Sequence, residues 1–160
     1  MRYILRACIP RENTEKYVDE LITACKYASI DEIMMCEDNI FITAIPQPLT
    51  AHREMADIIK GAVRKFKKNG IKSSFYLKSL VGHFTSEAFV LPYEMFVGLN
   101  GERSTSEPCL LDTEFAEYAA TLMSYYAECG FESMMIDDDF RSMSHCRQYG
   151  SACGPFNFIM

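Results

Sequence analysis

Apolar segments with two different periods alternate along the chain. Residues 3–9 and 71–77 alternate loosely between apolar and polar positions, whereas the short runs at 33–36 and 133–136 are apolar almost throughout. These segments predict four strands, and the continuous runs are typical of strands buried on both faces. Between the strands, apolar residues recur at helical spacing, and the predicted N-terminal caps of the helices are Asn13 or Thr14, Thr50 and Asp112.

The second and third predicted helices have the most regular apolar stripes. In the second helix the stripe consists of Met55, Ile58, Ile59, Ala62, Val63 and Phe66. In the third it consists of Phe115, Tyr118, Ala119, Leu122, Met123 and Tyr126. Before the third helix lies a stretch of about thirty residues without a clean period, from about 78 to 111. A loop of that length inside a compact domain is usually functional.

The order of elements is strand, helix, strand, helix, strand, long loop, helix, strand. Strands that alternate with helices are typical of a parallel sheet with crossover connections, so we expect an α/β fold. No composition shift or linker divides the chain, and residues 1–160 are therefore interpreted as a single domain.

Composition and charge exclude several functional classes. The chain is 49% hydrophobic and 24% charged, as expected for a globular domain. A net charge of −6 and a pI of about 5.1 argue against nucleic-acid binding. No apolar run reaches the roughly 20 residues that span a bilayer, and the charged start does not resemble a signal peptide. We therefore expect a cytoplasmic protein that does not contact a membrane, with seven cysteines that do not form a disulfide framework.

Polar side chains gather after the predicted strands. The carboxyl ends of parallel strands meet at one edge of a sheet, and α/β proteins bind their ligands there. The polar residues that follow the four strands are Arg11, Glu12, Glu37, Asp38, Asn39, His83, Asp137, Asp138, Asp139, Arg141 and His145. This edge is therefore the predicted functional site.

The run Asp137-Asp138-Asp139 is the sharpest local signal. Adjacent carboxylates repel one another, so at least one pKa should rise unless a cation such as Arg141 compensates. Carboxylates held in this way act as general acid, general base, nucleophile or metal ligand. The alternative is structural, because acidic residues after a strand often only cap a helix or face water.

Other chemistry is weakly supported. Cys146 and Cys153 lack the tight spacing of structural zinc ligands. The chain has no G-x-G-x-x-G after a strand, no P-loop and no G-x-S-x-G. We therefore expect no cofactor and no bound metal.

Five short motifs resemble those of one group of proteins. They are Tyr3-Ile4-Leu5-Arg6-Ala7, Asp31-Glu32-Ile33-Met34, Leu80-Val81-Gly82-His83, Val97-Gly98-Leu99-Asn100-Gly101 and Ile136-Asp137-Asp138-Asp139-Phe140-Arg141. In this order they resemble the N-terminal half of glycoside-hydrolase-like (β/α)₈ barrel proteins, a bacterial group related in fold to the retaining β-glycosidases. The resemblance covers nearly the whole chain.

The resemblance implies a parallel (β/α)₄ half of a TIM barrel with a carbohydrate site at its mouth. In that class the acid/base carboxylate follows the fourth strand, which is the position of Asp137, Asp138 and Asp139 here. The usual Asn-Glu pair is replaced by aspartates. Asp138 or Asp139 would be the proton donor or a ligand of a sugar hydroxyl, and Arg141 would orient the site. The other implied sugar-binding residues are His83, Glu37 and His145.

A whole barrel takes about 250 residues, so the chain is interpreted as a half that ends after the fourth strand. A retaining mechanism needs two carboxylates about 5 Å apart, and the half alone would be catalytically incomplete. Its open edges would favour self-association. Two alternatives remain: a non-catalytic sugar-binding or assembly module, and a metal-dependent sugar isomerase or aldolase. In the latter, the ligands would be Asp137, Asp139, Glu37 and His83.

Overall fold

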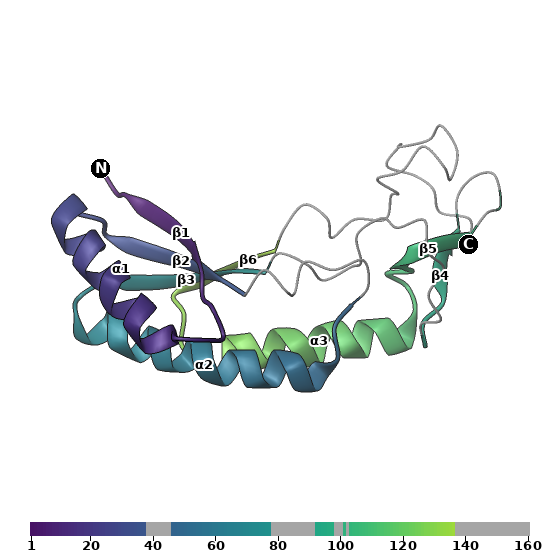
Figure 1. Ribbon diagram of the computed structural model, residues 1–160. Coiled ribbons are helices and arrows are strands. Elements are labelled where there is room, and N and C mark those ends of the chain that lie inside the picture. The colour runs from purple at the N-terminus through teal and green to yellow at the C-terminus, as the bar shows by residue number, and fades with distance from the viewer. Residues whose placement is uncertain (38–45, 78–91, 98–100, 102, 137–160) are drawn as a thin grey trace.

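The computed structural model is a four-stranded parallel sheet with three helices on one of its faces (Figure 1). The structure describes residues 1–37, 46–77, 92–97, 101 and 103–136. In chain order the elements are β1 (Ile4–Cys8), α1 (Thr14–Ala28), β2 (Glu32–Cys36), α2 (Leu49–Lys68), β3 (Lys72–Leu77), β4 (Met95–Val97), β5 (Arg103–Pro108), α3 (Thr113–Ala127) and β6 (Ser133–Ile136). The prediction of a mixed α/β fold with a parallel sheet is confirmed.

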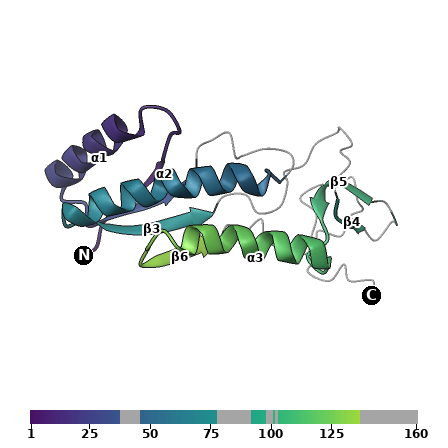
Figure 2. The same ribbon diagram turned by 90° about the horizontal axis from the view of Figure 1, so that it is seen from below.

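The strands of the main sheet follow the chain order β1-β2-β3-β6. All three pairings are parallel, with Cys8 opposite Cys36, Cys36 opposite Tyr76, and Leu77 opposite Ile136. The carboxyl ends of the four strands therefore lie along one edge. Figure 2 shows α1, α2 and α3 side by side across the same face of the sheet.

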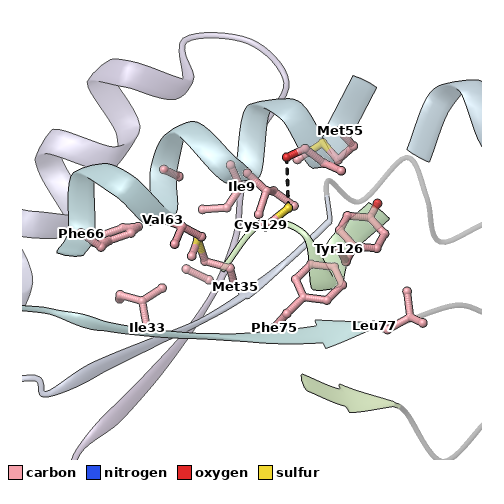
Figure 3. Close-up of a cluster of buried hydrophobic side chains, with 14 of the residues drawn as sticks. Ile9, Ile33, Met35, Met55, Val63, Phe66, Phe75, Leu77, Tyr126 and Cys129 are labelled. Atoms are coloured by element: carbon pink, nitrogen blue, oxygen red, sulfur yellow. Dashed lines mark hydrogen bonds between the residues drawn. The ribbon is translucent and has the colours of Figure 1, made fainter. Parts of the chain in front are cut away.

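The core lies between that face and the helices (Figure 3). Ile33 and Met35 of β2 and Phe75 of β3 are 0% exposed and face the helix layer. The ring of Phe75 stacks on Tyr126 of α3 with centroids 4.2 Å apart. Cys129 lies in the connection that follows α3, and its Sγ donates to the carbonyl oxygen of Ala56 on α2 at 3.3 Å. Aromatic and sulfur-containing side chains fill much of the space between the sheet and the helices.

The opposite face of the sheet carries no helix among the described elements. Side chains alternate along a strand, so Ile4 and Arg6 of β1 point away from the helix-facing Ala7. Ile4 is 49% exposed, and Met135 on β6 is 48% exposed. The Arg6 guanidinium lies 5.2 Å from the centre of the Tyr76 ring. Both outer strands, β1 and β6, therefore present apolar surface.

Two details differ from the sequence-based expectation. Thr50 was expected to cap the second helix, but α2 begins at Leu49 and the capping position is Pro48. The amide of Ala51 already donates to the Pro48 carbonyl oxygen, so the first turn closes ahead of Thr50. The stretch expected to be a loop contains the antiparallel hairpin β4–β5, in which Met95 lies opposite Pro108.

The other predicted caps have different outcomes. Asp112 caps α3 as expected, since its Oδ1 accepts the amide of Phe115 at 2.7 Å. Asn13 occupies the capping position of α1 in a left-handed conformation without a capping hydrogen bond from its side chain. Thr14 instead donates its hydroxyl to the carbonyl oxygen of Pro10. Within the described ranges, no helix is long and apolar enough to span a membrane.

Candidate functional site

Glu37 directly follows β2 at the carboxyl-terminal edge of the sheet. By continuation of the register it stands level with Leu77 and Ile136, the last residues of β3 and β6. This is the position predicted for it from the sequence. The Glu37 side chain is on the same side of β2 as Ile33 and Met35, so its carboxylate enters the helix layer, and it is 0% exposed.

His52, in the first turn of α2, meets this carboxylate. The histidine is 1% exposed, and its Nδ1 lies 3.3 Å from Oε1 of Glu37. Among the described residues, neither carboxylate oxygen of Glu37 has a partner with good hydrogen-bond geometry. A buried carboxylate costs several kcal/mol in desolvation, and the adjacent imidazole offsets part of that cost.

Two tyrosines of α3 complete the cluster. The Tyr126 hydroxyl lies 3.1 Å from Nδ1 of His52, and the Tyr118 hydroxyl lies 3.3 Å from Nε2. Both rings stand edge-on to the imidazole, with interplanar angles of 72° for Tyr118 and 87° for Tyr126. Tyr118 also donates its hydroxyl hydrogen to the carbonyl oxygen of Gln47 at 2.7 Å. We call Glu37, His52, Tyr118 and Tyr126 the buried cluster.

The hydrogen bonds of Tyr118 indicate how the His52 imidazole is oriented. Tyr118 has one hydroxyl hydrogen, and the Gln47 carbonyl accepts it, so the Tyr118 oxygen accepts from Nε2–H of His52. Nδ1 then faces the carboxylate of Glu37. Nδ1 also lies 3.1 Å from the Tyr126 hydroxyl, so the carboxylate and the phenol meet at the same ring nitrogen.

The two phenols stay neutral. Burial, followed by the neighbouring Tyr93 and the charge of Glu37, raises the pKa of Tyr118. Burial and then the charge of Glu37 raise the pKa of Tyr126. Because both pKa values lie above the usual range, the two tyrosines act as neutral hydrogen-bonding groups.

A cleft of about 560 Å³ lies on the other side of Tyr118. The residues before and at the start of α2, the segment before β4 and the N-terminal half of α3 form its walls: Pro46, Gln47, Pro48, Leu49, Pro92, Tyr93, Glu114, Glu117, Tyr118 and Thr121. Helices that follow parallel strands begin at the carboxyl-terminal edge, so the cleft opens on that side of the molecule. Tyr118 is thus both a wall of the cleft and a contact of His52.

The cleft combines aromatic and acidic groups. The rings of Tyr93 and Tyr118 lie 5.8 Å apart between centroids. Glu114 and Glu117 are exposed on α3. Such a surface offers flat apolar area together with carboxylate acceptors, and its volume is in the range of small-molecule sites.

Most of the residues predicted for the site lie outside the described residues: Asp137, Asp138, Asp139, Arg141, His83 and His145. Ile136 is the last residue of β6, so the aspartate run begins directly after the fourth strand of the sheet. The roles of these residues stay predictions. The described part of the chain contains no group of three or more His, Cys, Asp or Glu residues that could hold a metal ion.

His52 is not among the residues predicted for the site from the sequence. It stands three residues before Met55, at the first position of the stripe of α2, and a polar residue on an apolar stripe is the signal that could have revealed it. Tyr118 and Tyr126 were predicted as core residues and are buried, but their hydroxyl contacts were not foreseen.

No protein-family model and no curated protein matches the chain. Among solved structures, it is similar to a crystal structure of a hypothetical protein from Ruminiclostridium thermocellum ATCC 27405. The TM-score is 0.56 with 12% sequence identity, over 83% of this chain and 75% of the other. At this identity the similarity supports the fold alone.

Proposed function

We propose that the chain is a carbohydrate-binding (β/α)₄ half-barrel of the glycoside-hydrolase-like type, with its sugar site at the carboxyl-terminal edge of the sheet. Two features support the barrel. The strand order follows the chain order, and the three helices share one face, as the outer layer of a barrel does. The remaining strands of a barrel would cover the opposite face, where Ile4 and Met135 are exposed.

The observation that carries the proposed site is the link between the cleft and the buried Glu37–His52 pair through Tyr118. Sugars present apolar C–H faces and many hydroxyl groups. The Tyr93 and Tyr118 rings suit the faces, and the carboxylates of Glu114 and Glu117 suit the hydroxyls.

Glu37 contributes to this site through His52 rather than by touching the sugar, since its side chain is 0% exposed. The pair keeps Nε2–H directed at Tyr118 and so fixes the tyrosine hydroxyl on the Gln47 carbonyl. A fixed wall lowers the conformational entropy that the protein loses when a ligand binds.

Cleavage is assigned to the aspartate run after β6. Asp138 or Asp139 is the proposed acid, with Asp137 as the third carboxylate of the run, and Arg141, His83 and His145 complete the sugar contacts. The second carboxylate of a retaining mechanism would come from another half-barrel, so hydrolysis requires an assembled barrel.

Cellobiose and p-nitrophenyl β-D-glucoside are suitable probes, with binding measured by ligand-observed NMR and hydrolysis by release of nitrophenol. We expect Glu117→Gln to weaken cellobiose binding about tenfold, which corresponds to the loss of one charge-assisted hydrogen bond of about 1.4 kcal/mol. Glu20→Gln, on the exposed side of α1, is the matched control and should bind as the unsubstituted chain does.

Three results would distinguish the alternatives. If Asp138→Asn and Asp139→Asn keep binding and lose hydrolysis, the run is catalytic. If no variant hydrolyses but cellobiose still binds in the cleft, the chain is a binding module. Binding of neither probe, or equal affinities for Glu117→Gln and Glu20→Gln, would contradict the proposed sugar site.

A further inference from the structure

Two cysteines stand side by side at the same edge of the sheet. Cys8 is the last residue of β1 and Cys36 the last of β2, and the two are register partners. Their sulfur atoms are 3.4 Å apart, and the Cys36 thiol also donates to the carbonyl oxygen of Ala7 at 3.4 Å. Neither the cleft nor the buried cluster includes them.

The spacing of the two strands is compatible with a disulfide between these cysteines. Neighbouring strands lie about 4.8 Å apart, within the range of roughly 4.4–6.8 Å between the Cα atoms of bonded cysteines. The sulfurs must approach by a little over 1 Å to reach the S–S distance of about 2.05 Å, which side-chain rotation supplies. Both strands keep their register because they are hydrogen-bonded neighbours.

The two thiols differ in access. Cys36 is 0% exposed, whereas Cys8 is partly exposed. A reagent of the size of glutathione therefore reaches Cys8 first, and only a sulfur on Cys8 can reach Cys36. This difference in access determines the order of the two steps.

We propose that Cys8 and Cys36 are a redox-active pair that forms a reversible disulfide by exchange with a small-molecule disulfide such as oxidised glutathione. In the first step, the Cys8 thiolate attacks one sulfur of the oxidised glutathione. The S–S bond breaks, a mixed disulfide forms on Cys8, and one glutathione leaves as thiolate.

In the second step, the Cys36 thiolate attacks Sγ of Cys8 and expels the second glutathione. Two cysteine thiols are oxidised, one glutathione disulfide is reduced to two thiols, and the two protons of the cysteines end on the glutathiones. The new bond joins the ends of β1 and β2 directly beside Glu37, and a small-molecule thiol reverses both steps.

Other described cysteines provide internal controls. Burial raises the pKa of Cys25 and raises that of Cys129 to about 11, so both thiols stay protonated at neutral pH. Cys129 donates to the backbone oxygens of Ala56 and Tyr125. These two cysteines should remain unmodified.

The test is incubation of the folded chain with oxidised glutathione, followed by intact-mass measurement and a non-reducing tryptic digest. The expected product is lighter than the reduced chain by two hydrogen atoms for this pair, and its digest contains the peptide 7–11 joined to the peptide 27–53. Dithiothreitol should restore both peptides.

Substitutions test the order of steps. The reaction of the Cys36→Ala variant should stop at a stable glutathione adduct on Cys8. In the Cys8→Ala variant, Cys36 should remain unmodified. Circular dichroism checks that both variants fold, and Cys25→Ala should behave as the unsubstituted chain does. The proposal is overturned if the joined peptide is absent from the oxidised folded chain, or if Cys8→Ala and the unsubstituted chain modify Cys36 equally. This inference is independent of the proposed sugar site.

Discussion

Glu37 and His52 are ionisable side chains in the core of the molecule, with Oε1 of Glu37 and Nδ1 of His52 3.3 Å apart. A buried ion pair contributes little net stability compared with an apolar pair, but the loss of one partner leaves the other charge uncompensated. The pair is therefore expected to show strong coupling in mutational experiments.

His52→Ala should lower the free energy of unfolding by about 3–5 kcal/mol, because it leaves the Glu37 carboxylate buried without its imidazole. In a separate cycle, the double substitution Glu37→Leu with His52→Leu should lower the free energy of unfolding by less than the sum of the losses for Glu37→Leu and His52→Leu alone. Urea denaturation measures all four corners of this cycle.

The neighbouring residue on α2 supplies the control. Arg53 pairs with Glu128 at 3.4 Å, but both side chains are about half exposed. Arg53→Ala should therefore cost about 1 kcal/mol or less. A loss for His52→Ala no larger than that for Arg53→Ala would contradict the coupling of His52 to Glu37.

At the scale of single residues, sequence reasoning located Glu37 but not its partners. Glu37 follows an apolar run, and a strand end indicates an edge position without any knowledge of the neighbours. The contacts of His52 with Tyr118 and Tyr126 depend on how α2 packs against α3. That packing joins residues more than sixty positions apart, and no local period encodes it.

At the scale of elements, one cap joins α3 to the hairpin. Asp112 accepts the Phe115 amide through Oδ1 and the Glu94 amide, just before β4, through Oδ2 at 3.2 Å. One carboxylate thus orders the start of a helix and the start of a strand.

Asp112→Ala should destabilise the chain by about 1–2 kcal/mol, since it leaves both amides without their acceptor. Thr50→Ala is the matched control, because Thr50 is exposed in α2 and does not cap it, and it should change stability by about 0.5 kcal/mol or less. Thermal unfolding followed by circular dichroism compares the two. Equal shifts would show that the Asp112 cap is unimportant.

The helices and the four parallel strands could be predicted because each has a period that its own residues carry. Phe66 and Leu122 belong to stripes that only a helix places on one face. The hairpin could not be predicted in this way. Its second strand, Arg103–Pro108, has no apolar alternation, and its partner β4 is only three residues long. Pairing across the turn, rather than local pattern, makes these residues strands.

At the scale of the whole molecule, the sheet has two edges at which no other described strand pairs. β1 and β6 are the outer strands, and Tyr3, Ile4 and Leu5 expose 51%, 49% and 36% of their surface. Exposed apolar residues on an edge strand favour pairing with another chain.

We expect the average mass from light scattering to exceed that of the monomer and to rise with protein concentration. Ile4→Lys should shift the mass toward the monomer, because a charge on an edge strand opposes strand pairing. Tyr27→Lys is the control, since Tyr27 is 93% exposed but belongs to α1 and not to an edge strand. Monomeric mass at every concentration would rule out self-association through β1.

The sequence by itself determined the order and the type of the main elements, the parallel sheet and the position of Glu37 at its carboxyl-terminal edge. These properties follow from local periods and from the direction of the strands. Only the tertiary structure decided that Glu37 faces the helices, that His52 lies beside its carboxylate, and that Tyr118 lines a cleft while contacting His52. The tertiary structure also brings the sulfur atoms of Cys8 and Cys36 to 3.4 Å from each other. Such contacts depend on register and on helix packing, which are properties of the assembled layers rather than of any one segment.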